Sequence, residues 1–285
     1  MSIKLGNISI NSLGVINKGY LGSGVIFGGG ETAFISLWET TTDNETITLP
    51  VALPYTWDWG DGTINTETSH EYATAGQYTI KTSDTLTDWN FLAINTSRLN
   101  ILGISNFSKN FVTLQGQFIN CVNLDISAPT NTTINTATIW GSQFKSNSIL
   151  IGGDWLSNLD TSIVINLSEA FSRCYKMNVP LNWDTSNVES WQNFLYVCTD
   201  FNQDVSNLDY SSAKNLSNFM GSKSSANYDA TYYDNLLIKW DSQLVFANMV
   251  NVNIGMGTIK YTAAGATAHA SLLAKGFIVT DGGQI

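Results

Sequence analysis

The sequence predicts a multidomain, mainly β protein, in which strand-rich segments precede a repeat solenoid and an α/β unit closes it. Three observations predict this. A four-residue pattern returns five times between residues 114 and 223. Segment 34–82 is rich in β-branched and aromatic residues with turn residues between them, which is typical of strands. Segment 228–280 alternates helical and extended patterns.

The repeat places residues at i, i+3, i+4 and i+7, positions that share one face of a short helix. Its copies begin 24 to 27 residues apart, and the i+4 column is apolar in every copy. A unit of this length cannot bury its apolar face alone, so we expect successive units to stack and cover one another. The copies are Leu114, Gln117, Phe118, Cys121; Trp140, Gln143, Phe144, Asn147; Leu167, Ala170, Phe171, Cys174; Trp191, Phe194, Leu195, Cys198; and Leu216, Phe219, Met220, Lys223.

A second signature, Asn-Leu/Trp-Asp, lies twelve residues ahead of the i+4 column in the last three copies. Segment 182–204 contains Asn182-Trp183-Asp184-Thr185-Ser186-Asn187-Val188 and then Phe194-Leu195-Tyr196-Val197-Cys198. This segment resembles the BspA-like surface-protein repeat, a divergent leucine-rich repeat. The resemblance covers about a third to a half of the chain. It implies a leucine-rich-repeat type α/β solenoid, a scaffold for binding or display.

Composition limits the function classes. The 285 residues include 23 acidic and 13 basic ones, and the net charge of −10 would repel a phosphate backbone, so we expect no nucleic-acid partner. The first residues alternate polar and apolar, unlike a secretory signal. No run approaches the ~20 apolar residues of a membrane span, so no membrane insertion is expected. We therefore expect the product to stay in the cytoplasm or to leave it inside an assembled particle.

Three cysteines do not indicate a disulfide framework. Cys121, Cys174 and Cys198 share one repeat column, and neighbouring turns of a solenoid lie ~4.8 Å apart. An internal ladder of buried thiols is the favoured expectation. Whether Cys174 and Cys198 pair stays open.

Residues 1–30 have the pattern of short strands in hairpins, with alternating apolar residues around Asn and Gly breaks. Such a segment has too little core to fold alone. Asn17-Lys18-Gly19-Tyr20-Leu21-Gly22-Ser23 resembles a segment near the start of virion proteins of tailed bacteriophages, notably phages of Bacteroidetes. The resemblance implies a segment for virion docking or oligomerisation; a hairpin packed on the next domain is the alternative. The apolar residues expected to carry docking are Ile8, Ile10, Val15, Ile16, Tyr20, Leu21, Val25, Ile26 and Phe27.

Residues 31–86 contain Tyr55-Thr56-Trp57-Asp58-Trp59-Gly60-Asp61-Gly62-Thr63, followed by strand residues around His70 and Tyr72. These motifs closely resemble a PKD domain, which implies an immunoglobulin-like (PKD-like) β-sandwich. Asp58 and Asp61 lie in a tight turn, where backbone N–H groups usually satisfy carboxylates, so we expect neither metal nor catalysis there. His70 is expected to pack or hydrogen-bond within its strand.

Residues 87–226 are expected to hold the solenoid with an N-terminal capping turn, and residues 227–285 an α/β C-terminal cap. The closing part has helical patterns at 228–243 and 263–275 and strand patterns at 250–254 and 277–280. It resembles the unit that often follows BspA-like repeats. His269 is expected to be a surface or packing histidine.

Catalytic constellations are few. A nucleophilic triad needs a histidine near Ser or Cys, but His70 and His269 fall in separate modules. Zinc sites need His and Cys clustered at short spacing, and the sequence has no such cluster. The carboxylates that a glycosidase could use are Asp154, Asp160, Asp184, Asp204 and Asp209. Three of them, Asp160, Asp184 and Asp209, recur in the Asn-Leu/Trp-Asp column and are better explained as architecture. We expect no enzyme activity, no metal and no cofactor.

Together these features predict a structural protein of a bacteriophage virion, assembled in the host cytoplasm, as capsid decoration, head fibre or tail-associated protein. Its expected partners are other virion proteins, further copies of itself, and a host-surface glycan or protein. The residues expected to contact a ligand are Tyr196, Asn202, Gln203 and Tyr210. The alternatives are a bacterial BspA-like surface adhesin, which would need an export signal, and a polysaccharide-degrading enzyme.

Overall fold

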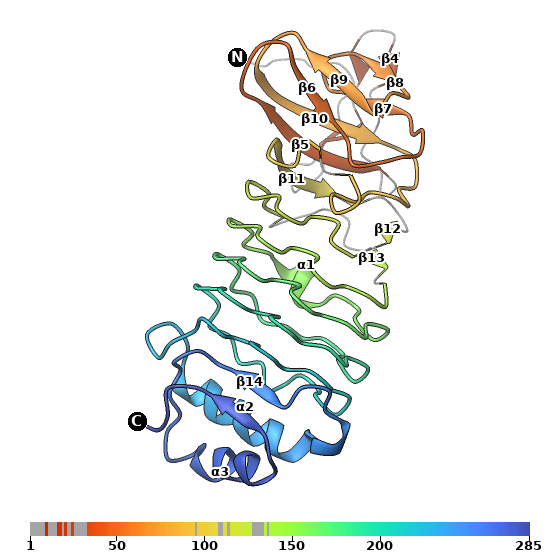
Figure 1. The fold of residues 1–285 in the computed structure, drawn as a ribbon. Helices are drawn as coiled ribbons and strands as arrows, with labels where there is room; N and C mark the ends of the chain where they lie inside the picture. Colours follow the sequence, from red (N-terminus) through yellow and green to blue (C-terminus); the bar gives the residue numbers. More distant parts are fainter. Residues whose placement is uncertain are drawn as a thin grey trace.

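The computed structural model describes residues 33–94, 96–107, 111, 115–126 and 137–285 (Figure 1). It also gives the backbone of strand residues 9–10, 16–18, 20–21, 24–25, 112 and 134–135. The described chain is mainly β with few helices. It runs from antiparallel sheets at one end, through stacked coils of chain, to two helices at the other (Figure 1).

Four short strands precede residue 33, and they pair as two antiparallel hairpins. They are β1 (Ser9–Ile10) with β2 (Ile16–Lys18), and β3 (Tyr20–Leu21) with β4 (Gly24–Val25). The side chains expected to carry docking lie outside the described residues.

Two open antiparallel sheets form the next part of the chain. The larger sheet has the order β11-β5-β10-β7-β8, and β6 pairs with β9 in the smaller one. The strands are β5 (Phe34–Thr40), β6 (Glu45–Thr48), β7 (Trp57–Asp58), β8 (Ile64–Asn65), β9 (Ser69–Tyr72), β10 (Gly76–Thr82) and β11 (Ile101–Asn106). The tryptophans of this part, among them Trp38, Trp57 and Trp59, are fully buried. They supply the large apolar area that two small sheets need for a core.

Strand β11 joins the sheets to the coils. One of its edges pairs antiparallel with β5, while Gly103 forms a parallel bridge with Asp125 of the first coil. The Asp125 amide donates to the Leu102 carbonyl at 3.0 Å. Residues 101–106 fall in the segment expected to form the N-terminal capping turn. In the structure they form an edge strand of the larger sheet and also pair with the first coil.

Successive coils are connected by backbone hydrogen bonds. Parallel bridges link Ile139 to Asn166, Asn166 to Ser190, Ser190 to Asn215, and Asn215 to Asn251. Two short strands, β12 (Phe111–Val112) and β13 (Ile134–Asn135), are also parallel, and a single helical turn, α1 (Asp154–Ser157), lies in the second coil. The repeating unit of the sequence is therefore one coil of this stack.

The four-residue pattern does not form the short helix that its spacing predicts. Each copy is instead a run of consecutive turns, defined here as the turn strip: residues 115–121, 141–147, 168–174, 192–198 and 217–223. Glu169 and Arg173 have φ of 60° and 64°, and Asn193 and Val197 have 54° and 59°. Every fourth residue has a left-handed backbone conformation. The chain therefore makes separate turns and does not continue as a helix. Alternate amides then point to the next coil: Phe171 N donates to Phe194 O at 3.2 Å and Arg173 N to Tyr196 O at 2.7 Å.

The i+4 column lines a common interior. Phe118 stacks on Phe144 with 5.5 Å between ring centroids, and Phe144 stacks on Phe171 at 5.8 Å. Leu195 and Met220 continue the column and are fully buried. One cluster of buried apolar side chains extends from Phe34 in the sheets to Phe277 near the end of the chain.

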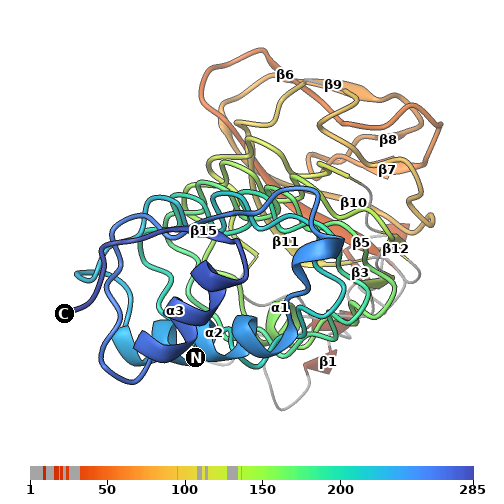
Figure 2. The same ribbon diagram turned by 60° about the horizontal axis from the view of Figure 1, so that its bottom comes forward.

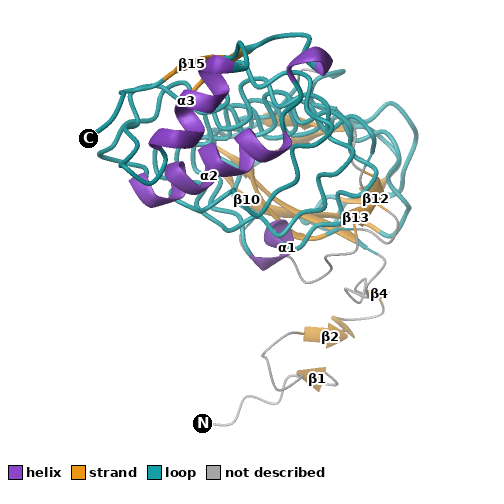
Figure 3. Ribbon diagram, turned by 90° about the horizontal axis from the view of Figure 1, so that it is seen from below, coloured by secondary structure: helices purple, strands orange, loops and turns teal. Residues whose placement is uncertain are grey.

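The last part of the chain lies across the end of the coils (Figures 2 and 3). Its elements are α2 (Ala230–Gln243), the 3₁₀ turn η1 (Phe246–Asn248), β14 (Asn253–Gly255), α3 (Ala266–Ala274) and β15 (Ile278–Thr280). Asp229 caps α2 by accepting the Thr231 amide at 2.7 Å. Trp240 packs its ring 5.5 Å from Phe219 of the last coil, and β14 pairs parallel with β15. Helix α2 therefore packs on the last coil through Trp240.

Candidate binding recess

The exposed side chains of the turn strip are charged in some coils and uncharged in others. In the second and third coils it carries charges: Lys145 pairs with Glu169 at 2.8 Å, and Arg173 is exposed. In the fourth and fifth coils the exposed positions hold amides, hydroxyls, an aromatic ring and glycine. A hollow lies at this uncharged end.

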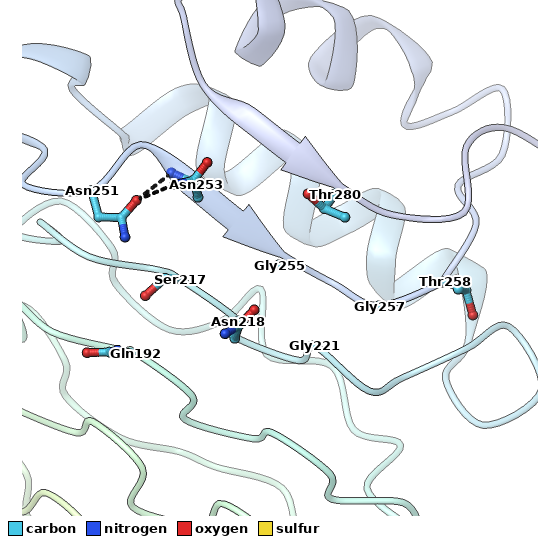
Figure 4. A pocket seen from close by; sticks show the side chains of 10 residues that line it. All are labelled: Gln192, Ser217, Asn218, Gly221, Asn251, Asn253, Gly255, Gly257, Thr258 and Thr280. Atoms are coloured by element: carbon cyan, nitrogen blue, oxygen red, sulfur yellow. Dashed lines mark hydrogen bonds between the residues drawn. The ribbon is translucent and has the colours of Figure 1, made fainter.

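The hollow has a volume of about 650 Å³, within the range of ~300–1,000 Å³ that is usual for small-molecule sites. It is formed by the fourth and fifth coils together with β14, the segment after it, and β15 (Figure 4). We call it the recess and define it by its lining residues: Gln192, Ser217, Asn218, Gly221, Asn251, Asn253, Gly255, Gly257, Thr258 and Thr280. None of these side chains is ionisable.

Several polar side chains of the recess are free to bind. Gln192, Asn218, Thr258 and Thr280 are exposed, and their side chains hydrogen-bond to no residue in the described part of the chain. Asn251 Oδ1 accepts two hydrogen bonds from Asn253, at 2.9 Å and 2.8 Å, which fixes both amides on one edge (Figure 4). Amides and hydroxyls both donate and accept, so the recess offers both kinds of group.

Glycines keep the floor of the recess free of side chains. A Cβ at Gly255 would lie 2.7 Å from the Cα of Asn218, and one at Gly257 would lie 2.3 Å from the carbonyl oxygen of Lys223. Gly257 also has a φ of +68°. Both positions therefore require glycine because the backbones of β14 and the fifth coil approach so closely. Their role is this close approach, and as glycines they add no side chain to the lining of the recess.

Tyr196 stands beside the recess. A Cβ at Gly221 would lie 3.2 Å from Cδ2 of Tyr196, so one edge of the ring lies next to this glycine. The ring is half-buried, and its hydroxyl hydrogen-bonds to none of the described residues. Of the four residues expected to contact a ligand, Tyr196 is the one that lies next to the recess.

The other three lie elsewhere. Asn202 is exposed and Gln203 half-buried, and the side chain of Asn178 accepts hydrogen bonds from the Asn202 amide and from Gln203 Nε2. Tyr210 corrects the expectation: it is fully buried, with its ring 4.8 Å from Trp191, and its hydroxyl donates to the Val205 carbonyl at 3.0 Å. A side chain in the core cannot contact a ligand.

The turn carboxylates are satisfied locally. Asp58 accepts the Gly60 amide at 3.0 Å, and Asp61 accepts the Thr63 amide at 2.9 Å. Asp61 also lies 2.7 Å from His70, whose ring stacks on Trp59. Burial acts to raise the pKa of Asp61, but the Thr63 amide and the His70 ring outweigh it and hold the pKa below its ordinary value.

The aspartates of the Asn-Leu/Trp-Asp signature fix the coils. Asp160, Asp184 and Asp209 each accept the amide of the serine two residues further on, at 3.1, 3.1 and 2.8 Å. Hydrogen bonds from Ser162 lower the pKa of Asp160. Among the described residues, no group of three or more His, Cys, Asp or Glu side chains could hold a metal ion.

The remaining candidate groups are held in the core or at its edge. His269 has 12% of its side chain exposed; it lies 3.2 Å from Asp281, which also accepts the Tyr233 hydroxyl at 2.6 Å. The three cysteines are free and buried, and burial raises the pKa of Cys198 to about 12. Cys174 and Cys198 donate instead to the carbonyls of Phe144 and Phe171.

Most of the residues that line the recess were not predicted from the sequence. Gln192 and Ser217 follow directly after the i column of the repeat, so their exposure could have been read from the period. Asn253, Gly255, Thr258 and Thr280 come from outside the repeats. No local pattern indicates that these segments meet the fifth coil.

One family model matches residues 113–233; its description is "Mycoplasma protein of unknown function, DUF285". The matched range spans the coils and the start of α2. No curated protein and no solved structure matches the chain significantly. Across the described ranges, no helix is both long and apolar enough to cross a bilayer.

Proposed function

We propose that this protein is a non-catalytic display component of a bacteriophage virion. Its first sheets are a PKD-like, immunoglobulin-like sandwich, and its coils are a leucine-rich-repeat type solenoid closed by the C-terminal helices and strands. The observation that carries the proposal is the single buried core from Phe34 to Phe277, with β11 shared by sheet and coils. Such a continuous core favours a stiff rod. Strand β14, which helps to line the recess, lies near one end of this rod (Figure 1).

The proposal assigns attachment to residues 1–28 and ligand contact to the recess. Removing residues 1–28 should leave a soluble, folded remainder, because this deletion removes none of the described core, which extends from Phe34 to Phe277. The truncated protein should no longer join particles. The measurement is mass spectrometry of purified particles made with the full-length or the truncated protein, with circular dichroism of both proteins as the folding control. Equal incorporation of the two would contradict the assignment of attachment.

A bacterial surface adhesin is the second candidate, because the matching family is described as a Mycoplasma protein family. The same rod would then project from a cell. Antibody labelling of intact cells, set against its detection in purified particles, separates the two: label on uninfected cells favours the adhesin.

A further inference from the structure

We propose that the recess binds an uncharged saccharide, with Tyr196 as the aromatic surface on which a sugar ring packs. The biological meaning of this site depends on the proposed display function, whereas the binding itself can be tested on the isolated full-length chain.

The polar groups favour a neutral, hydroxyl-rich ligand. The chain carries a net charge of −10, yet the recess contains no ionisable side chain. A charged ligand would lose water without gaining an ion pair. A ligand with many hydroxyl groups can both donate to and accept from the free groups of Gln192, Asn218, Thr258 and Thr280.

The shape also favours a saccharide over a peptide. Peptide-binding grooves hold apolar side chains in apolar pockets. Here the floor is glycine backbone at 221, 255 and 257, and the rim is amide and hydroxyl. The aromatic side chain next to the recess is Tyr196, which is half-buried beside Gly221 and whose hydroxyl hydrogen-bonds to none of the described residues. A flat apolar ring beside a polar floor matches the apolar face and polar edge of a sugar ring.

The test uses the full-length protein on a glycan array that contains neutral, sialylated and sulfated oligosaccharides, followed by calorimetry with the strongest neutral ligand. Gln192→Ala and Thr258→Val should each weaken binding about 3- to 10-fold, the effect of one lost hydrogen bond. Tyr196→Ala should weaken it further, and Tyr196→Phe should retain most of it. Each altered side chain except that of Tyr196 is exposed and unbonded to the described residues, so the urea midpoint of those variants should not change.

Control variants alter the same residue types at exposed positions that do not line the recess. Gln115 occupies the position of Gln192 in the first coil and is exposed, and Tyr175 is a tyrosine with 38% of its surface exposed. Gln115→Ala and Tyr175→Ala should bind as the unaltered protein does.

Four outcomes would overturn the proposal: no saccharide binding, binding restricted to acidic glycans, saccharide binding that the recess variants leave unchanged, or binding to peptides alone on a parallel peptide array. None of these outcomes depends on particle incorporation. Saccharide binding by a protein that is missing from particles would instead reject the virion assignment and leave the site intact.

Discussion

Lys223 is the last residue of the column that holds Cys174 and Cys198, and its side chain hydrogen-bonds to backbone carbonyls at the end of that column. The two thiols each donate to one carbonyl of the preceding coil. Lys223 is 2% exposed, and its Nζ donates to the carbonyls of Thr199 at 2.9 Å, Phe201 at 2.5 Å and Asn227 at 3.3 Å. A single ammonium thus satisfies three backbone acceptors where the regular stacking stops.

This arrangement predicts an alkaline pH dependence. Burial lowers the pKa of Lys223 from 10.5 to about 8. Between pH 8 and about 10.5 the unfolded chain therefore holds a proton that the folded chain has released, so the contribution of Lys223 to stability rises with pH in this window. Below pH 8 both states are protonated and the contribution is constant.

The comparison with Lys223→Met isolates this residue, since the other titrating groups are common to both proteins. The free energy of unfolding of the unaltered protein minus that of the variant should increase from pH 8 to pH 10 in urea titrations. A difference that stays flat or decreases over this range would show that the ammonium is not desolvated as the structure indicates.

At the scale of the element, the turn strip explains where the repeat pattern succeeded and where it misled. The spacing identified Phe118, Phe144 and Phe171 as a column, because four-residue turns and helical turns bring nearly the same positions inward. The spacing could not distinguish a helix from a run of turns. The left-handed residues Glu169, Arg173 and Val197 are of types that rarely have a positive φ, so the sequence does not indicate this conformation.

Val197 is the most strained of these positions, because a β-branched residue at φ of 59° is an outlier. Asn tolerates this conformation well. Val197→Asn should raise the free energy of unfolding by about 1 kcal/mol through relief of this strain. The measurement is chemical denaturation monitored by tryptophan fluorescence.

Val245→Asn is the matched control, since Val245 is 50% exposed and has an ordinary φ of −109°. Its effect should stay within about 0.5 kcal/mol. If both substitutions shift stability equally, polarity rather than backbone strain is the cause.

At the scale of the whole molecule, the sequence pattern did not predict the contacts between residues far apart in the chain. Tyr210 was expected on an exposed strand face of the repeats, yet the ring of Trp240, thirty residues on, packs against it with 5.9 Å between ring centroids. The recess likewise depends on β14 and β15 reaching the fifth coil, where the Gly255 carbonyl accepts the Met220 amide at 2.9 Å. Periodicity describes each coil and its neighbours, but not where the chain returns after the repeats end.

The stacked architecture predicts how far the effect of a destabilising substitution extends along the chain. Each coil contacts its neighbours, so destabilisation should stay near its source although the core is continuous. Trp89 and Trp240 are matched probes: both are fully buried, one among the rings of Phe34 and Trp38 and the other against Phe219. Replacing either with alanine should cost about 3–5 kcal/mol locally.

Amide hydrogen exchange locates the loss. Trp240→Ala should reduce protection in α2 and in residues 215–223 while β10 keeps the protection of the unaltered protein. Trp89→Ala should do the reverse, since its neighbours belong to the sheets. A uniform loss along the chain in both variants would mean that sheets, coils and helices unfold as one unit, and β11 would then couple the two ends more strongly than a nearest-neighbour stack allows.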